Sequence, residues 1–579
     1  MWWLKDLDRL KQEVAGVEAL EEQVAWLINA RPRLRKDFRF AFEFDLVVNG
    51  EIYPFTLEYP ALFPDTPPSV LPRDDRRLSE HQYGDGGELC LEFRSDNWDP
   101  SVTGVMMIES AYRLLSGEQP DADRRAIVPS AHNTSLGQEL RGWHCRFLLT
   151  RSFLAQAASM PEGTCRDAGV CEIISVKDMW VAYVTALGPA GAPEWREPEV
   201  PDRGNLVEPG IVVRVTSLSG FPALPDKAFL EQLISGARVR ESQAPPGEIT
   251  VPRFTIVADA QSARLFFTHP KDDGWNVIPY RTVDLSADGG GRLPESYAAL
   301  ADKTVGVVGC GSLGSKIAVS LARSGIGGFV LVDDDVLAPG NLRRHELDAG
   351  ALGSHKTDGL RARLEAVAPG IRVIAWRVVL GGQESAGGTA SVLDELGKCD
   401  LLIDATADSR AFNFVASVAR SARRPMVWAE VYAGGIGGFV ARVRPDIEPP
   451  PHAARRQYLA WCHEQGVAWV AEDQDYGARL GDGPPAVADD AEVAVIAAHA
   501  SRMAIDVLLR PDASGFPHPA YVIGLWREWI FEEPFDTRPV DFVAEGQWQG
   551  LITEEQTDEA VQFLSSLFEK GEDADRPGA

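Results

Sequence analysis

Apolar and polar residues alternate near the start of the chain. In the stretch DFRFAFEFDLVV, every second residue from 38 to 48 is apolar, and this period predicts a strand with one buried face. The following Asn49–Glu51 is a hairpin turn signal, and a second alternation over 53–59 predicts the partner strand. Helical spacing over 7–27 and 101–115 flanks the hairpin. The N-terminal part is therefore predicted to be an α+β domain.

Short apolar runs recur through the second half of the chain. They are VGVV, GFVLV, IRVIAW, LLID and MVWAEV, and segments with helical spacing lie between them. Buried strands that alternate with helices are typical of a parallel sheet covered by helices. The second half is therefore predicted to hold a Rossmann-like α/β domain.

The region between these two parts has a less regular pattern. Strand-like runs alternate there with loops rich in proline and glycine, and Ser286–Ser296 has the composition of a flexible joint. We expect a mixed linker domain. The patterns together predict a multidomain chain with domains at 1–150, 151–295 and 296–579, the last of which includes a C-terminal extension.

Composition narrows the classes of partner. The chain has 85 acidic and 57 basic residues, a net charge of −28, and such a field repels nucleic acid and anionic membranes. No apolar run reaches the roughly eighteen residues of a membrane span, and the first residues lack the pattern of a signal peptide. Seven sparse cysteines suit a reducing compartment. We therefore expect a cytoplasmic protein that binds neither nucleic acid nor membrane.

A glycine motif follows the first apolar run of the second half. Gly309, Gly311 and Gly314 fit the spacing G-x-G-x-x-G, which allows a tight turn and a close approach of the backbone to phosphate. Asp333 lies nineteen residues after Gly314, where an acidic residue meets a ribose hydroxyl. The motif predicts a nucleotide site without saying which nucleotide, and a nicotinamide enzyme also fits it.

Charged and polar residues gather after the second apolar run. They are Asp333, Asp335, Asn341, Arg343, Arg344 and Lys356. Hydride transfer needs few cations near the phosphates, whereas an adenylating enzyme must stabilise a pentavalent α-phosphate and a leaving pyrophosphate. Asp404, at the end of the run LLID, is our candidate metal ligand. The alternative is that these residues are surface charges on a plain dinucleotide fold.

The combined pattern GxGxxG…DxDxxxxxNLxR…K…DxxxD resembles that of ThiF/MoeB-type and ubiquitin-activating enzymes, over roughly residues 300–509. The resemblance implies ATP and Mg²⁺ as cofactors and a homodimer. It implies that Arg344 and Lys356 act in catalysis. It also implies that the glycine turn and Asp335 contact the nucleotide and that Asp333 binds the ribose. Asp404 would bind Mg²⁺. The phosphates would be contacted by Asn341, Arg344 and Lys356.

Two features depart from this family pattern. His345 stands where the family usually has glutamine. The arginine-rich segment that often precedes the first strand, and that reaches into a partner's site, is not evident in ESYAALADK.

Enzymes of this kind often use a cysteine to take the acyl group from the adenylate. Cys310 lies inside the glycine turn and Cys399 just before a strand, so we expect both to be structural. Cys462 follows Asp404 by 58 residues and is the relay candidate. The alternatives are that Cys462 packs in a core or in a degenerate metal-binding region, and that another thiol attacks the adenylate directly.

Cys90 is the other candidate thiol. It lies in the acidic, glycine-rich stretch GDGGELCLEF, and a transfer cysteine must be accessible to a macromolecular acyl donor, as a loop allows. Its neighbours Asp85, Glu88 and Glu92 would raise its pKa. The alternatives are a buried structural cysteine and a metal ligand. A separate zinc site is conceivable at His144, Cys145, Cys165 and Cys171, although their spacing matches no usual zinc site.

The segments around Cys90 resemble ubiquitin-conjugating enzymes over about residues 1–150. The proline-rich stretch YPALFPDTPPSV lies before Cys90 in the sequence. His81 lies nine residues before Cys90, and Trp98, in NWDP, lies eight residues after it. The resemblance implies that Cys90 carries an acyl group as a thioester and passes it to a target amine. Tyr83 stands where the family has the asparagine thought to support the oxyanion, and its hydroxyl, Asn97 or backbone amides are the possible substitutes.

Together these resemblances describe a relay in one chain. An ATP-dependent module activates the C-terminal carboxylate of a ubiquitin-like or other tailed protein, and the acyl group passes by thioesters to a target protein amine. The layout resembles fused ligases of bacterial antiphage operons of the CBASS type, whose ligated protein is the CD-NTase, and those of related ubiquitin-like operons. The alternatives are a stand-alone ThiF-type adenylyl- or sulfur-transferase with an N-terminal binding module, and a nicotinamide enzyme.

Overall fold

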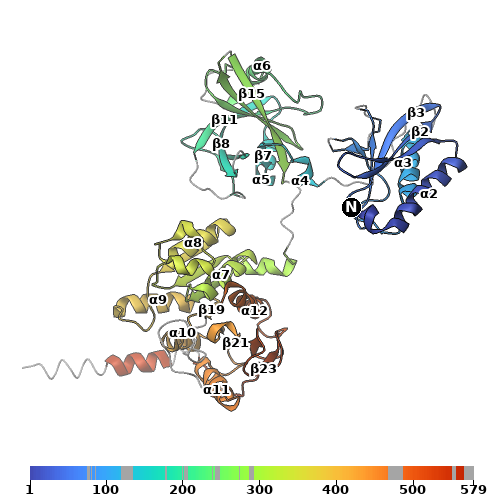
Figure 1. The fold of residues 1–579 in the computed structure, drawn as a ribbon. Coiled ribbons are helices and arrows are strands. Elements are labelled where there is room, and N and C mark those ends of the chain that lie inside the picture. Colours follow the sequence, from blue (N-terminus) through green and yellow to red (C-terminus); the bar gives the residue numbers. More distant parts are fainter. Residues whose placement is uncertain are drawn as a thin grey trace, which may run out of the picture. The chain divides into compact units, whose positions relative to one another are not determined.

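The structure of the protein is a computed structural model. It describes residues 1–74, 78–79, 81–84, 86–118, 135–176, 179–198, 200, 206–237, 239–241, 248–272, 274–285, 293–466, 487–550 and 556–565. The chain divides into two compact units, Met1–Trp143 and His144–Ala579, and the second unit contains two separate sheets (Figure 1).

The first unit is an antiparallel sheet with two long helices. Its strands follow the order β1 (Leu27–Leu34), β2 (Phe40–Val48), β3 (Glu51–Glu58), β4 (Ser69–Pro72). The predicted hairpin is confirmed: the alternate residues of β2 and β3 are buried, and Asn49 and Gly50 have φ angles of 50° and 83°, as a two-residue hairpin turn requires. Phe38 is the exception, because it lies before β2 and is 59% exposed.

The helices of this unit differ slightly from the predicted ranges. They are α2 (Leu7–Gln23) and α3 (Gly104–Glu118). The first ends early because Leu27 pairs with Leu46 and starts β1. The buried carboxylate of Glu13 in α2 accepts hydrogen bonds from the Tyr59 hydroxyl at 2.7 Å and the Gly104 amide at 2.7 Å, which satisfies the buried charge and joins α2, the end of β3 and α3.

The middle sheet has nine strands that close on themselves. Their order is β10-β9-β7-β15-β14-β13-β11-β8-β12, and β9 also pairs with β8, so seven of them form a ring. Helix α5 (Arg151–Ser159) packs on one face and α6 (Lys227–Ser235) on the other. The strand bounds are β7 Cys145–Leu149, β8 Thr164–Val176, β9 Met179–Leu187, β10 Trp195–Arg196, β11 Val207–Arg214, β12 Val239–Glu241, β13 Arg253–Ala258, β14 Ala263–Lys271 and β15 Gly274–Asp284.

The last sheet has eight strands in the order β18-β17-β16-β19-β20-β21-β22-β23. The first five are parallel, and they coincide with the five apolar runs of the sequence. Their bounds are β16 Thr304–Val308, β17 Gly328–Val332, β18 Arg372–Trp376, β19 Leu401–Asp404 and β20 Met426–Val431; the antiparallel edge is β21 Gly437–Val443, β22 Ala520–Gly524 and β23 Thr537–Val540. The predicted α/β fold of this region is confirmed.

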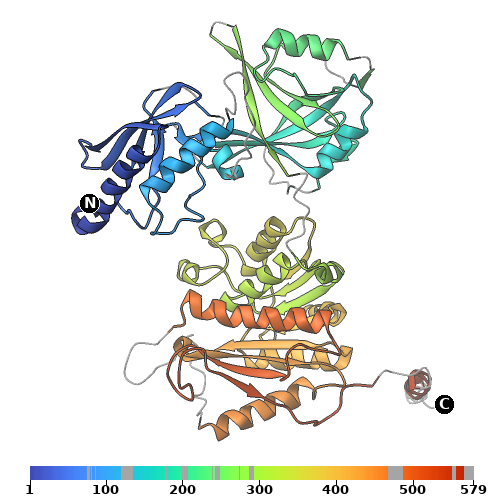
Figure 2. The same cartoon turned by 90° about the vertical axis from the view of Figure 1, so that its right-hand side faces the viewer.

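Helices cover both faces of this sheet (Figure 2). One core contains residues of α7 (Ser312–Arg323), α8 (Lys356–Val367) and α12 (Asp490–Leu509). The opposite core contains residues of α9 (Ala386–Lys398), α10 (Ser409–Ala422) and α11 (Pro451–Glu464). The strand order reverses between β16 and β19, and ligands of such sheets bind at the carboxyl ends of the strands on either side of this point.

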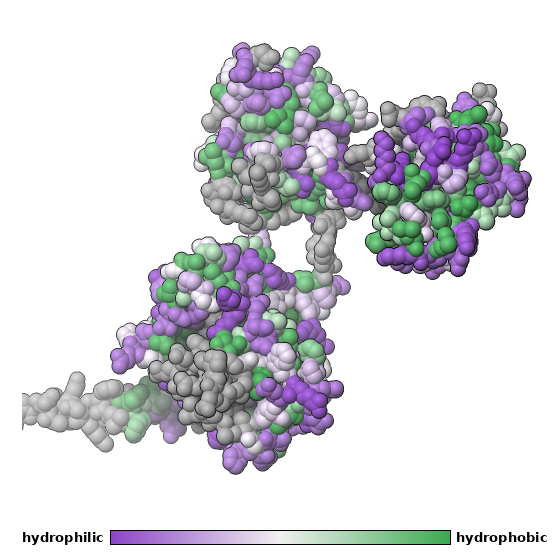
Figure 3. Space-filling view, in the orientation of Figure 1, coloured by the Kyte–Doolittle hydropathy of each residue, from purple (hydrophilic) through white to green (hydrophobic). Residues whose placement is uncertain are grey.

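No helix in the described part of the chain is both long and apolar enough to cross a membrane. Hydrophilic and hydrophobic residues are mixed over the visible faces (Figure 3).

Candidate active sites

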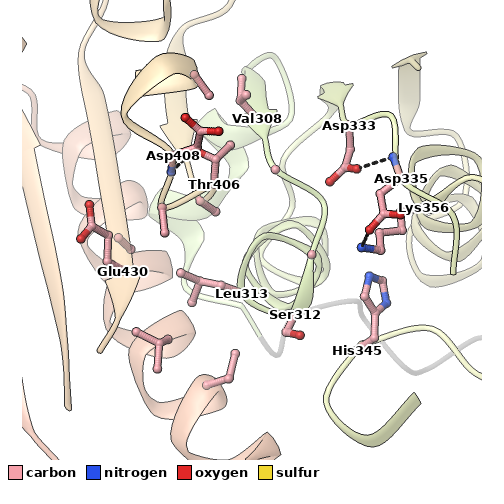
Figure 4. Close-up of a pocket in the computed structure, with 18 of the residues that line it drawn as sticks. Val308, Ser312, Leu313, Asp333, Asp335, His345, Lys356, Thr406, Asp408 and Glu430 are labelled. Atoms are coloured by element: carbon pink, nitrogen blue, oxygen red, sulfur yellow. Dashed lines mark hydrogen bonds and ion pairs between the residues drawn. The ribbon is translucent and has the colours of Figure 1, made fainter. Parts of the chain in front are cut away.

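A cavity of about 430 Å³ lies at the carboxyl ends of β16, β17, β19 and β20. Its volume suits a nucleotide-sized ligand. Most of the predicted nucleotide contacts line it, namely Gly309, Gly311, Asp333, Asp335, Asn341, Arg344 and Lys356. Figure 4 shows Asp408 and Glu430 on one side of the cavity and Asp333, Asp335 and Lys356 on the other, with Ser312 and Leu313 between them.

The glycine turn leaves room for a ligand at the start of α7. Gly309 has a φ of +87°, and a Cβ atom on Gly314 would lie 1.8 Å from the Gly309 carbonyl oxygen. Gly314 therefore packs beneath the turn and does not line the cavity. Gly311 precedes α7 and has nothing within 4 Å of its Cβ position. The free backbone N–H groups at a helix N-terminus favour an anion such as phosphate.

Asp333 joins the end of β17 to the glycine turn. Its carboxylate accepts the Cys310 amide at 2.7 Å and the Asp335 amide at 2.8 Å, while the residue also lines the cavity. Burial raises the pKa of this carboxyl. Its position at the cavity wall fits a role in recognising a ribose.

Lys356 is a buried cation at the cavity. Only 5% of the residue is exposed, and its ammonium pairs with the Asp335 carboxylate. Burial acts to raise the pKa of Asp335, but the hydrogen bond from Lys356 and other donors outweigh it and lower the pKa. The Asp335 carboxylate therefore stays ionised and holds the Lys356 side chain at the cavity.

His345 connects the glycine turn to the loop that carries Asn341 and Arg344. Its Nδ1 accepts the Leu347 amide at 3.1 Å, so the ring proton lies on Nε2, which donates to the Cys310 carbonyl oxygen at 2.8 Å. Burial lowers the pKa of the ring and keeps it neutral. A glutamine side chain also offers one acceptor and a donor, so the departure from the family pattern preserves this type of bonding.

The carboxylate that faces the cavity after β19 differs from the predicted one. Asp404 is 4% exposed, accepts the Thr406 amide at 3.0 Å and hydroxyl at 2.7 Å, and is absent from the lining. Burial raises its pKa to about 6. Asp408, four residues on, lines the cavity, and its hydrogen bond from Arg410 lowers its pKa. Asp408 therefore suits Mg²⁺ better, because the ion binds ionised oxygen ligands.

Glu430 is a second carboxyl of the cavity that the sequence analysis missed. It lies in β20 and is half-buried, and burial raises its pKa to about 7, with Asp404 adding to the shift. Its place at the end of an apolar run was the available signal. Among the residues described, no three His, Cys, Asp or Glu side chains gather as a metal site. Mg²⁺ commonly takes one or two protein carboxylates together with substrate phosphates, and Asp408 offers an ionised one at this cavity.

The cysteines of the last sheet are all enclosed. Cys310, Cys399 and Cys462 each have 0% of their surface exposed. Burial raises the pKa of Cys399 to about 12 and that of Cys310 well above its ordinary value. Cys462 lies in α11, in the core beside α10. A relay thiol must be reached by a protein tail, so this placement does not suit the predicted relay role.

The conceivable zinc site does not assemble in the described chain. Cys145 lies in β7, whereas Cys165 and Cys171 lie in β8 and are buried.

Cys90 follows a short hairpin of the first unit. The hairpin consists of β5 (Gln82–Tyr83) and β6 (Glu88–Leu89), and the Cys90 amide donates to the His81 carbonyl oxygen at 2.8 Å. Cys90 is buried, although its 9% exposure exceeds the 0% of Cys462. Asp85 lies outside the described residues.

The neighbouring segments are tied to one another. Trp98 Nε1 donates to the Pro64 carbonyl oxygen at 2.7 Å, which joins the proline-rich stretch to the segment after Cys90. Asn97 bridges its own loop: its side-chain amide donates to the Glu92 carbonyl at 2.8 Å, and its side-chain oxygen accepts the Arg94 amide at 2.7 Å. The proline-rich stretch and the segment after Cys90 are therefore joined by the Trp98 bond.

Part of the chain is similar to a known protein family. Residues 291–518 match the model of the ThiF family. The chain is 33% identical over 204 residues to the uncharacterized protein y4oA of Sinorhizobium fredii, covering 30% of this chain and 33% of that protein.

Two further relatives have informative names. The ATP-dependent ubiquitin transferase-like protein Cap2 of Pseudomonas aeruginosa is 31% identical over 172 residues, covering 27% of this chain and 28% of that protein. The probable adenylyltransferase/sulfurtransferase MoeZ of Mycobacterium tuberculosis is 30% identical over 157 residues, covering 27% of this chain and 36% of that protein. The chain thus matches 28–36% of these three relatives' lengths.

Proposed function

We propose, from the match of residues 291–518 to the ThiF family model, that this region adenylates the C-terminal carboxylate of a tailed protein with ATP and Mg²⁺. The observation that carries the proposal is the cavity at the start of α7, which brings Asp333, Arg344, Lys356 and Asp408 together. A carboxylate oxygen of the tail attacks the α-phosphorus, the bond between the α-phosphorus and its bridging oxygen breaks, and pyrophosphate leaves.

The lining residues have separable tasks in this step. The N–H groups at Gly311 and Ser312 and the cations of Arg344 and Lys356 stabilise the charge that grows on the phosphates. Asp333 binds the ribose. When Mg²⁺ is bound it neutralises phosphate charge, and Asp408, with Glu430 nearby, would hold it. The two cations that line the cavity, Arg344 and Lys356, favour adenylation over the nicotinamide alternative.

Cys90 is the acyl carrier of the second step in this proposal. Its thiolate attacks the acyl carbon and AMP leaves; a target amine then attacks the thioester, and the thiolate leaves. The complete burial of Cys462 supports direct transfer to Cys90 over a relay through Cys462. Joining acceptor and donor in one chain raises their effective concentration. The name of Cap2, ATP-dependent ubiquitin transferase-like, supports this type of chemistry.

The biological setting that we propose rests on the resemblances in the sequence. We propose that the first unit is a ubiquitin-conjugating-like domain, that the tail belongs to a ubiquitin-like protein or a CD-NTase in antiphage defence of the CBASS type, and that the chain acts in the cytoplasm as a homodimer. The name of MoeZ favours a second candidate, an adenylyl- or sulfur-transferase whose N-terminal unit only binds.

Tail-dependent exchange between pyrophosphate and ATP tests the first step. We expect exchange when the chain is mixed with Mg²⁺ and ubiquitin-like proteins or CD-NTases encoded beside it, and a loss of at least about 100-fold in Lys356→Ala. Lys398→Ala removes an exposed lysine of α9 and is the matched control. Tight NADH binding without exchange would contradict the proposal. Covalent conjugation that persists in Cys90→Ala would favour the second candidate.

A further inference from the structure

The hairpin beside Cys90 has two distinct faces. Tyr83 pairs with Glu88 and Gln82 with Leu89, and the bond from the Cys90 amide to the His81 carbonyl continues this antiparallel register by one residue. Residues opposite each other on paired strands share a face, and alternate residues along a strand share it too. One face therefore carries His81, Tyr83, Glu88 and Cys90. The other carries Gln82 and Leu89.

The burial of Leu89 supports this assignment. Leu89 is 4% exposed and packs in the core of the first unit, so its face points inward, while Cys90 on the other face is 9% exposed and also buried. Tyr83 is 45% exposed. It lies diagonally across the hairpin from Cys90, a separation that an aromatic side chain spans. Partial burial and the nearby Glu88 and Cys90 raise the pKa of Tyr83, so its hydroxyl keeps its proton at neutral pH.

Three donor groups in the segment from Cys90 to Asn97 hold the local structure. Both ends of the Asn97 amide hold its own loop. The Cys90 amide donates to His81, and the Glu92 amide donates to the Ser110 hydroxyl at 2.9 Å. The formation and the cleavage of a thioester each pass through a tetrahedral intermediate with a negative oxygen, which a placed donor stabilises.

We propose that the Tyr83 hydroxyl donates a hydrogen bond to the oxyanion formed at the acyl carbon on Cys90. This inference rests on the proposed role of Cys90 as acyl carrier, and it makes Tyr83 a catalytic residue of that step. The Cys90 thiolate adds to the carbonyl carbon, the carbonyl electron pair moves to the oxygen that faces Tyr83, and collapse expels the leaving group. Attack by an amine repeats this sequence, with Cys90 as the leaving thiolate.

The test loads Cys90 of the full chain chemically and therefore bypasses adenylation. The probe is the 2-mercaptoethanesulfonate thioester of acetyl-glycyl-glycine, and the acyl group on the Cys90 peptide is followed by mass spectrometry during loading and during discharge to glycinamide. Alkylation of Cys90 by iodoacetamide is measured in parallel. Alkylation uses the same thiolate but forms no oxyanion, so it separates catalysis from a change in thiol access.

We expect Tyr83→Phe to slow loading and discharge by about 100-fold and to leave alkylation within twofold of the unaltered chain. Tyr53→Phe removes a hydroxyl that donates to Glu51 at 2.8 Å in β3 and should change neither rate. Acyl transfer within twofold in Tyr83→Phe would overturn the inference, as would an equal loss of transfer and alkylation. A selective loss in Asn97→Ala would assign the oxyanion donor to Asn97 instead. If the unaltered Cys90 is alkylated but never acylated, its proposed role as acyl carrier also falls, while the exchange assay still judges adenylation.

Discussion

Single carboxyl groups decide how the cavity can bind a metal ion. Asp404 and Asp408 follow the same strand, yet Asp404 bonds Thr406 beneath the cavity and Asp408 lines it. Only Asp404 was named from the sequence as the candidate metal ligand. The turn at Ala407, with a φ of 55°, decides which one points outward, and no periodicity reports such a turn.

Asp408→Asn should therefore lose adenylation more severely than Asp404→Asn. We expect the rate of pyrophosphate exchange to fall at least about 100-fold in Asp408→Asn, with partial recovery at high Mg²⁺, because a neutral amide is a poor ligand for the ion. Asp404→Asn keeps an oxygen that accepts from Thr406, so its rate should stay within about tenfold. The opposite ranking would return the metal role to Asp404.

The raised pKa values of two carboxyls predict a pH dependence of stability. Burial raises the pKa of Glu430 to about 7 and that of Asp404 to about 6, whereas both titrate near 4 in an unfolded chain. The folded state then holds more protons between about pH 4 and pH 7, so the free energy of unfolding falls as the pH rises through this window.

Glu430→Gln should remove part of this dependence. Between pH 5 and pH 8, the free energy of unfolding of the unaltered chain should fall by about 1–2 kcal/mol more than that of the variant. Calorimetric melting of the full chain at both pH values measures it. An unchanged pH dependence in the variant would show that Glu430 is not protonated in the folded protein at pH 5.

At the scale of elements, the connection between β16 and α7 positions the phosphate site. A side chain at Gly311 would meet no other atom within 4 Å, so Gly311→Ala should fold normally and only obstruct the ligand. We expect its melting temperature to be unchanged and its ATP affinity to fall at least tenfold, as measured by calorimetric titration. Gly340→Ala, also unobstructed, is the control. Normal ATP affinity in Gly311→Ala would place the phosphates elsewhere.

Local pattern was sufficient for the hairpin of β2 and β3 and for the parallel strands of the last sheet, but not for the short hairpin before Cys90. The alternation over 40–59 specified a hairpin, and the five apolar runs matched the parallel strands in position. The pattern failed where pairing over long distances decides the structure. Strand β1 was not predicted, and its first residue, Leu27, fell at the end of the predicted helix, because only the pairing with β2 reveals this strand. The closure of the middle ring depends on β7 pairing with β15, which lies more than a hundred residues later.

At the scale of the whole molecule, the account joins an ATP-dependent module to an acyl-carrying thiol. The path of the acyl group distinguishes this arrangement from a two-thiol relay. Cys462 is enclosed in the core beside α10, so Cys462→Ser should leave the conjugation rate within about threefold of the unaltered chain, as followed by gel electrophoresis of the products. Complete loss of conjugation with normal melting would restore the relay role to Cys462.

The most direct test of the account is the intact mass of the chain after incubation with ATP, Mg²⁺ and a tailed protein encoded beside it. We predict an adduct of the mass of that protein less one water, cleaved by dithiothreitol, present in Cys462→Ser and absent in Cys90→Ala. An adduct that persists in Cys90→Ala and disappears in Cys462→Ser would contradict the central claim.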